Sequence, residues 1–296
     1  MRIVHVKNPA NLAWRLAEGQ RKLGHEAIVW SRGDRYGFPY DVLMPSGAKW
    51  NLWLLKKLPE LSTFDILHVH GGAWRGDVAY KVISILLSKM PIFIHCNGSE
   101  ARHGGGLHWM SISDGTFYTD PDIARFMPEG SVWVPQPIDT SLICNASSTE
   151  NERPVFVHVP SAPELKGTNA IKNMFQQTFP NGEAELRIVS GVTHKAALNA
   201  MREADIVFDQ ISPMGIYGFT SVEAMALGKP VLATLDRNLY PADCPVIYPC
   251  ATKLMELAYD VTGRRHYGSL GRAYVERVHS STVVARKVLD AYEAVL

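Results

Sequence analysis

The residues best suited to chemistry gather in the second half of the chain. Lys166-Gly167 stands between two predicted elements, and Asp209 directly follows a short apolar run. Gly218-Phe219-Thr220-Ser221 then opens a segment with apolar residues at helical spacing, and Glu223 falls near its start. Backbone amides at a helix N-terminus bind anions, and a nearby lysine adds positive charge. The pattern therefore predicts a phosphate site with a carboxylate beside it, within reach of a group such as a sugar diol.

A strand, a loop, a helix and a second strand must position these residues. Residues 206–208 predict a short buried strand, and the loop after it contains Pro213 and Gly215. Gly228 ends the helix, and an apolar strand at 231–235 follows. In open α/β sheets, ligands bind at the carboxyl ends of the strands. We therefore expect the lysine and the aspartate, which both follow strands, to lie at one edge of a sheet.

Residues 217–231, Tyr-Gly-Phe-Thr-Ser-Val-Glu-Ala-Met-Ala-Leu-Gly-Lys-Pro-Val, resemble the nucleotide-sugar-binding motif of family 4 glycosyltransferases. The resemblance spans nearly the whole chain and is strongest from residue 154 to 235. It implies an α/β fold of GT-B architecture, with two Rossmann-like domains facing each other across a cleft. It also implies a hexosyltransferase-type enzyme that moves a sugar from a nucleotide diphosphate to an acceptor, with retention and without a metal.

The resemblance also assigns roles to residues of this chain. Glu223 is implied to bind the ribose of the donor, and Lys166 to carry the charge of the leaving group. The nucleotide-sugar-binding set is Lys166, Gly167, Gly218, Phe219, Thr220, Ser221 and Glu223. A UDP- or GDP-linked sugar is the expected co-substrate, and no other cofactor is expected.

Three positions depart from the family pattern. Gly215 replaces the carboxylate that usually lies eight residues before Glu223, and Ser161 or Pro160 replaces an arginine upstream of the Lys-Gly pair. Asn97 stands where related enzymes have a histidine that contacts the donor sugar, and asparagine carries no proton.

The catalytic residues that we predict are Asp209, Asn97 and Lys166. Asp209 begins the loop at the end of its strand, so we expect it to supply the missing negative charge to the donor sugar. The alternative is that Asp209 caps a turn or the loop backbone.

The first half of the chain opens with a strand at residues 3–6, a helix at 12–23 and a strand at 27–30. It lacks the G-x-G-x-x-G pattern of dinucleotide-binding folds. The loops after its predicted strands carry the acceptor-side candidates, which are Asn8, His70, Gly72, Trp74, Arg102 and His103.

Four histidines raise the question of a metal site: His68, His70, His95 and His103. His68 and His70 share one face of a predicted strand, but no carboxylate motif accompanies them and the chain contains no H-E-x-x-H pattern. We therefore expect no metal, and we expect these histidines to pack near a site.

Composition excludes several classes of protein. The 296 residues carry 30 basic and 29 acidic side chains, which give no bulk cationic face for nucleic acid. Four scattered cysteines favour reduced thiols, and no signal-peptide pattern or long apolar run is present. These features predict a cytoplasmic protein with at most peripheral membrane contact.

The expected domain organisation follows the resemblance. Residues 1–145 form an acceptor-side Rossmann-like domain, and residues 152–279 form a nucleotide-sugar-binding one. A polar, unpatterned segment between them suggests the linker. Residues 280–296 are expected to form a helix that crosses back onto the first domain through an apolar stripe of Val283, Val284, Val288 and Leu289.

Two other functions remain open. One is a nucleotide-sugar epimerase of similar fold. The other is an inactive, glycosyltransferase-like nucleotide-binding or scaffold subunit, which Gly215, Asn97 and the missing arginine favour. The base and sugar of the donor are open as well, as is the acceptor, which is a sugar, a lipid-linked molecule, a small molecule or a protein.

Overall fold

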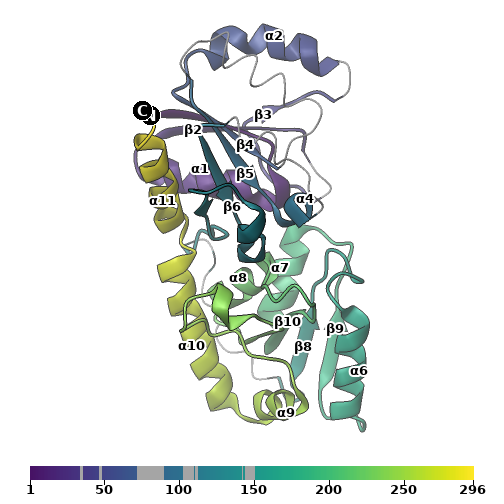
Figure 1. Cartoon of the computed structure of the whole chain (residues 1–296). Coiled ribbons are helices and arrows are strands. Elements are labelled where there is room, and N and C mark those ends of the chain that lie inside the picture. Colours follow the sequence, from purple (N-terminus) through teal and green to yellow (C-terminus); the bar gives the residue numbers. More distant parts are fainter. Residues whose placement is uncertain are drawn as a thin grey trace. The chain divides into compact units, whose positions relative to one another are not determined.

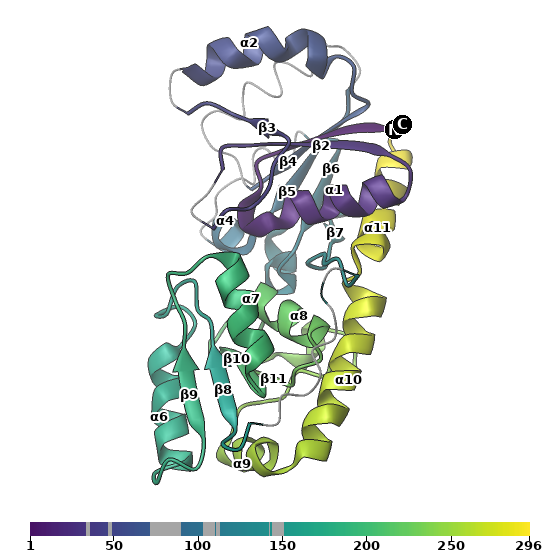
Figure 2. The same cartoon turned by 180° about the vertical axis from the view of Figure 1, so that it is seen from behind.

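The computed structural model of the chain describes residues 1–33, 36–46, 49–71, 90–102, 110, 113–141, 143 and 151–296. The chain divides into two compact units, one of Met1–Asp139 with Ser280–Leu296 and the other of Thr140–His279 (Figures 1 and 2). Each unit is a parallel sheet with helices, so the α/β prediction is confirmed. The first unit ends at Asp139, before the expected end at residue 145.

The first unit contains a seven-stranded parallel sheet. Its strand order is β3 (Val42–Leu43), β2 (Glu26–Ser31), β1 (Arg2–Val6), β4 (Ile66–His70), β5 (Ile92–Cys96), β6 (Gly115–Tyr118) and β7 (Val132–Trp133). The central strands β1, β4 and β5 are almost wholly buried. Parallel sheets are covered on both faces, which explains these apolar runs.

Helices α1 (Leu12–Lys22) and α11 (Ser281–Glu293) pack together against one face of this sheet. Val284, Val288 and Leu289 are buried there, as the predicted stripe requires. Val283 is 46% exposed, which corrects its place in that stripe. The buried face of α11 instead continues through Ala285 and Tyr292, at the three- and four-residue spacing of a helix.

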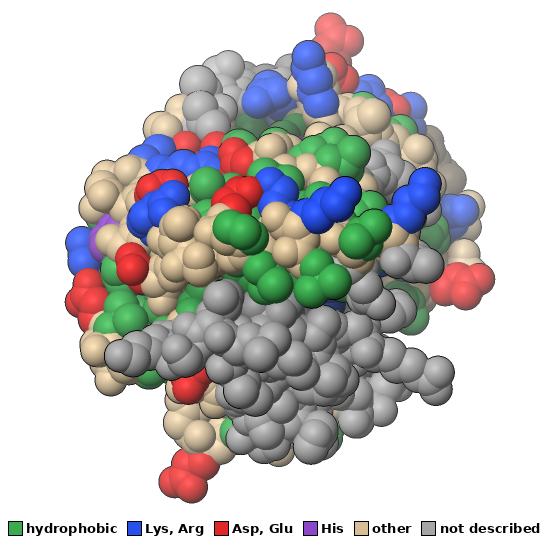
Figure 3. Space-filling view, turned by 90° about the horizontal axis from the view of Figure 1, so that it is seen from above, with side chains coloured by type: hydrophobic (Ala, Val, Ile, Leu, Met, Phe, Trp, Pro, Cys, Tyr) green, Lys and Arg blue, Asp and Glu red, His purple; other side chains and the backbone are tan. Residues whose placement is uncertain are grey.

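The other face of the sheet carries α2 (Lys49–Leu61), whose Trp50, Leu54 and Leu61 join a second apolar cluster. Leu52 and Leu55 of α2 are exposed. Figure 3 shows hydrophobic and basic side chains next to one another on the face that is seen from above. Shorter elements of this unit are η1 (Pro9–Asn11), α4 (Gly98–Arg102) and η2 (Pro121–Phe126). No helix among the described residues is both long enough and apolar enough to cross a membrane.

The second unit contains a four-stranded parallel sheet in the order β11 (Val231–Ala233), β10 (Ile206–Gln210), β8 (Val155–His158) and β9 (Glu185–Ile188). Its helices are α6 (Thr168–Thr178), α7 (His194–Glu203), α8 (Phe219–Ala226), η3 (Arg237–Leu239), α9 (Ala251–Tyr259) and α10 (Val261–Val278). The apolar run at 246–248 is a single bridge, Ile247 to Leu232, rather than a strand. Pro245 and Pro249 flank this run, and proline lacks the N–H group that a sheet ladder needs.

Helix α10 packs against α8 and the turn that follows it. A Cβ atom at Gly268 would lie 1.9 Å from the carbonyl oxygen of Gly228, the residue that ends the motif helix. This close approach requires glycine at position 268, because a backbone carbonyl cannot move aside as a flexible side chain can. The packing of α10 thereby fixes the position of α8.

We predict that Gly268→Ala lowers the free energy of unfolding by about 1 to 3 kcal/mol, although alanine is the better helix former. Urea denaturation measures the effect. Ser269→Ala, at the next and exposed position of α10, is the matched control and should change stability by less than about 0.5 kcal/mol. Equal stability of the Gly268→Ala variant and the wild type would contradict the packing argument.

Candidate functional site

Asp209, at the end of β10, organises the candidate site. Its side chain is almost fully buried, and its Oδ1 accepts a hydrogen bond from Lys166 Nζ at 2.9 Å. Its Oδ2 accepts from the backbone N–H of Gly218 at 2.5 Å and from Ser221 Oγ at 2.7 Å. Burial alone would raise the pKa of Asp209, but Lys166 and these hydrogen bonds outweigh it and hold the pKa below 3.8. Asp209 is therefore an anion that ties Lys166 to the start of α8.

This geometry gives Asp209 a positioning role. Both of its carboxylate oxygens accept from donors within the second unit, in the capping arrangement that the sequence left as the alternative. A catalytic role of Asp209 toward a donor sugar stays a prediction.

Lys166 lies where its charge reaches the start of α8, as expected. Its Nζ also donates to Gln210 Oε1 at 2.6 Å, and it lies 2.7 Å from the place that a Cβ atom of Gly218 would take. Gly167 has φ +70°, and a Cβ there would lie 2.1 Å from the carbonyl oxygen of Ile211. Glycine is therefore required at position 167, whereas a Cβ at position 218 would displace only the end of the lysine side chain.

Helix α6 begins at Thr168 with Gly167 as its N-cap. Thr168 Oγ1 is hydrogen-bonded to His158 Nε2 at 2.9 Å, so the Thr168 side chain does not cap the helix.

The start of α8 is only partly available to a ligand. The N–H of Gly218 and the hydroxyl of Ser221 are both bound to Asp209, and Ser221 is fully buried. Both groups therefore already have a partner within the chain, and their direct contact with a phosphate stays a prediction. Gly218, Phe219 and Thr220 are half-buried, whereas the rest of α8 is buried.

Glu223 is buried on α8 and accepts a hydrogen bond from His194 Nε2 at 2.7 Å. His194 is the first residue of α7, whose N-cap is Thr193. The resemblance implies a ribose contact for Glu223, and nothing in the sequence pairs Glu223 with His194. Two residues that are 29 positions apart carry no local signal of contact.

A carboxylate does lie next to the gap in the motif. Gly215 has φ +63°, and a Cβ there would lie 3.0 Å from the Cβ of Asp236. The N–H of Asp236 donates to the carbonyl of Gly215 at 2.9 Å, and its carboxylate caps η3 through Asn238. No motif in the sequence singles out Asp236. Its position shortly after the end of β11 is the feature of the sequence that could have indicated a place near the site.

Tyr217 anchors the loop before α8. It is 3% exposed, and its hydroxyl hydrogen-bonds His279 Nε2 at 2.8 Å and the Tyr274 hydroxyl at 3.1 Å. Its ring stacks on Tyr240 with centroids 4.3 Å apart. Burial raises the pKa of Tyr217 well above 10, so this tyrosine is a neutral hydrogen-bonding group.

Two acceptor-side candidates of the first unit are occupied by their own surroundings. Asn8 is buried, accepts from the N–H of Trp14 at 3.1 Å and donates to the carbonyl of Pro39 at 3.0 Å. His70 is fully buried and hydrogen-bonded to His5. These contacts hold the loop and the core, and a role of Asn8 or His70 at an acceptor stays a prediction.

The structure describes two further candidates of the first unit, Arg102 and Asn97. Arg102 forms a two-pronged ion pair with Asp122 and a further contact to Asp120, which holds its guanidinium in place. Asn97 is half-buried between β5 and α4. Gly72, Trp74 and His103 lie outside the described residues.

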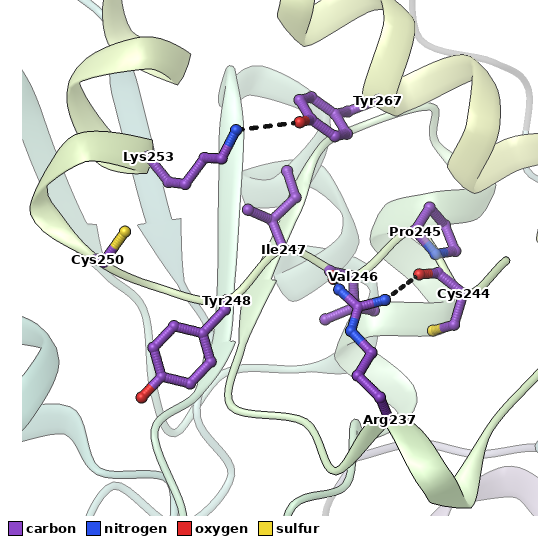
Figure 4. Close-up of a pocket in the computed structure, with 9 residues that line it drawn as sticks. All are labelled: Arg237, Cys244, Pro245, Val246, Ile247, Tyr248, Cys250, Lys253 and Tyr267. Carbon is purple, nitrogen blue, oxygen red and sulfur yellow. Dashed lines mark hydrogen bonds between the residues drawn. The ribbon is translucent and has the colours of Figure 1, made fainter. Parts of the chain in front are cut away.

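A cavity of about 420 Å³ lies elsewhere in the second unit (Figure 4). The segment 244–250 and the side chains of Arg237, Lys253 and Tyr267 line it. Arg237 donates hydrogen bonds to the carbonyl oxygens of Cys244 and Val246, and these bonds hold its side chain against the segment 244–250 that lines the cavity. None of the predicted site residues within the described ranges lines this cavity.

Comparison with solved structures identifies the fold. HepE of Anabaena, in complex with UDP and glucose, has 14% identity and a TM-score of 0.74, over 99% of this chain and 100% of that one. An alpha-glucosyltransferase in complex with UDP and DNA has 12% identity and a TM-score of 0.71, over 99% and 100%. The catalytic domain of starch synthase IV from Arabidopsis thaliana, bound to ADP and acarbose, has 12% identity and a TM-score of 0.69, over 100% and 99%.

These likenesses cover both units. At such low identity they establish the fold alone, and the chain has the α/β fold of GT-B glycosyltransferases, as the sequence predicted. No protein-family model matches the sequence, and no curated protein matches it.

We predict that Asp209→Asn lowers the free energy of unfolding by about 3 kcal/mol at pH 7, because it leaves Lys166 without its buried partner. The pKa of Asp209 is lowered in the folded state, so its contribution is present above pH 3.8. It is lost as the pH falls through the lowered pKa. Denaturant titrations of both proteins should therefore converge in acid.

Asp236→Asn is the matched control for this change. It alters an exposed aspartate that caps η3, and we expect a loss of less than about 1 kcal/mol. A loss from Asp209→Asn no larger than that of the control would disprove the positioning role of Asp209.

Proposed function

We propose that the protein is a glycosyltransferase that uses a nucleotide-diphosphate sugar, retains anomeric configuration and needs no metal for the transfer. One observation carries the proposal: Lys166 Nζ lies over the start of α8, held there by a buried aspartate. Sugar transfer from a nucleotide requires stabilisation of a diphosphate leaving group. A lysine beside the positive end of a helix dipole supplies that stabilisation without a metal.

The ion pair of Lys166 limits how the charge acts. Lys166 shares its ammonium with Asp209 and Gln210, so a diphosphate receives part of a positive charge together with the dipole of α8. Asp209 keeps the ammonium in place before the ligand arrives. Such preorganisation reduces the cost of ordering a long lysine side chain on binding.

The ribose is assigned to Glu223. Its carboxylate is an acceptor that suits a diol, and His194 Nε2 already marks the direction of its hydrogen bonds. Of the three similar solved structures named above, one contains UDP and glucose, one contains UDP and DNA, and one contains ADP and acarbose. We propose UDP as the first donor nucleotide to test, and we leave the acceptor open.

The second candidate is a nucleotide-binding subunit without transferase activity. Gly215 favours it, because its left-handed backbone and its packing on Asp236 exclude a carboxylate at the position where the family has one. The internal use of the Gly218 amide and the Ser221 hydroxyl favours it as well. Donor hydrolysis in the absence of acceptor separates a transferase from such a subunit.

We predict that UDP, or else GDP or ADP, raises the thermal unfolding midpoint and that EDTA does not reverse the rise. A ligand at 100 times its dissociation constant adds about 2.7 kcal/mol to the stability of the folded state. Differential scanning fluorimetry with UDP, GDP, ADP and CMP measures the effect. If no nucleotide shifts the midpoint, the assignment of the donor site is wrong.

We predict that Glu223→Gln weakens binding of the stabilising nucleotide by about tenfold to a hundredfold, the loss expected for a charge-assisted hydrogen bond. Calorimetric titration measures the dissociation constant. Glu203→Gln makes the same change at the exposed end of α7 and should leave the affinity unchanged. Unchanged affinity in Glu223→Gln would refute the ribose contact.

A further inference from the structure

Four histidines form a buried layer on one face of the sheet of the first unit. They are His5 on β1, His68 and His70 on β4, and His95 on β5, and each is fully buried. The strand register places His5 opposite His68, and His70 opposite His95. Three of these histidines, His68, His70 and His95, are candidates from the sequence alone, whereas only the pairing of β1 with β4 brings His5 to them.

The contacts of His5 fix where its hydrogen lies. Gln20 Oε1 can only accept, so His5 Nε2 donates to it at 2.7 Å. In a neutral imidazole with its hydrogen on Nε2, Nδ1 carries a lone pair. That lone pair faces His70 Nε2 at 2.9 Å.

Nitrogen atoms in this layer lack partners. His68 Nδ1 is hydrogen-bonded to the hydroxyl of Tyr292 on α11 at 2.5 Å, but His68 Nε2 has no hydrogen-bond partner. His70 Nδ1 is also buried without a partner. His95 Nδ1 lacks a partner as well. Buried polar atoms are nearly always satisfied, so three in one layer indicate that something else binds there.

We propose that His5, His68 and His70 bind a divalent transition-metal ion of the zinc type. Each offers one ring nitrogen, and in the described part of the chain the three nitrogens lie within 4.8 Å of one another. A set of imidazoles without carboxylates suits zinc and its neighbours rather than magnesium or calcium. The proposal revises the expectation, drawn from the sequence, that the chain holds no metal.

The geometry needs little adjustment for such an ion. Two ligands of tetrahedral zinc at ordinary bond lengths lie roughly 3.3 Å apart. His5 Nδ1 and His70 Nε2 are 2.9 Å apart, so the ion takes the place of the hydrogen between them. That hydrogen moves to Nδ1 of His70, the atom that is unpartnered now, and no proton leaves the site.

Outer contacts already orient two of the three ligands. Gln20 on α1 holds His5 through Nε2, and Tyr292 on α11 holds His68 through Nδ1. Metal-binding histidines usually carry such a partner on the nitrogen that does not bind the ion. The site is enclosed by α1 and α11, so its role is structural: it joins the C-terminal helix to the sheet.

The test begins with the wild-type protein, purified without chelators and analysed by inductively coupled plasma mass spectrometry. We expect about one equivalent of zinc or a related metal per chain. Protein refolded with Zn²⁺ should unfold at a higher temperature than protein refolded with EDTA. Protein refolded with Co²⁺ should show the strong visible absorption bands of tetrahedral cobalt.

Two glutamine variants complete the experiment. His68→Gln removes a ligand and should abolish bound metal, the cobalt bands and the effect of zinc on the unfolding midpoint. His158→Gln changes an equally buried histidine of the second unit and should keep all three. Absence of metal and of any zinc effect in the wild type, or full metal content in His68→Gln, would overturn the proposal. The wild-type measurements decide it even where a variant does not fold.

Discussion

The ion pair between Lys166 and Asp209 is the interaction on which the candidate site depends. Asp209 is buried, and its two carboxylate oxygens accept hydrogen bonds from Lys166, from the backbone amide of Gly218 and from the hydroxyl of Ser221. A buried carboxylate without these partners would strongly destabilise the folded state. The folded state therefore keeps all three donors at the carboxylate. One side chain thereby joins the end of β10 to the start of α8 and to the loop that carries Lys166.

The backbone around this ion pair accepts little variation. Gly167 and Gly218 leave room for Ile211 and for the lysine, and Gly268 leaves room for the turn after α8. Tyr217 ties the intervening loop to α10 through the hydroxyl of Tyr274. Rigid support of this kind suits a site that must place a positive charge before its ligand arrives.

The first unit is also built on a parallel sheet, but one face of that sheet buries histidines. A parallel sheet covered on both faces normally buries apolar side chains, yet here one face buries four histidines between β strands and two helices. Hydrogen bonds to Gln20 and Tyr292 satisfy part of this layer and connect it to α1 and α11. The C-terminal helix is thus joined to the first unit by polar contacts as well as by its apolar face.

The sequence by itself determined the alternation of strands and helices, the GT-B fold class, and the place of Lys166 near the start of α8. These features follow from local periodicity, from glycine positions and from a continuous motif, which are all written in neighbouring residues. Only the tertiary structure decided which partner each polar side chain takes. Asp209 accepts hydrogen bonds from Gly218 and Ser221, and Glu223 accepts one from His194. His5 lies next to His68 and His70. Such pairings join residues that are distant in sequence, and they are fixed by strand register and helix packing, which single-chain patterns do not encode.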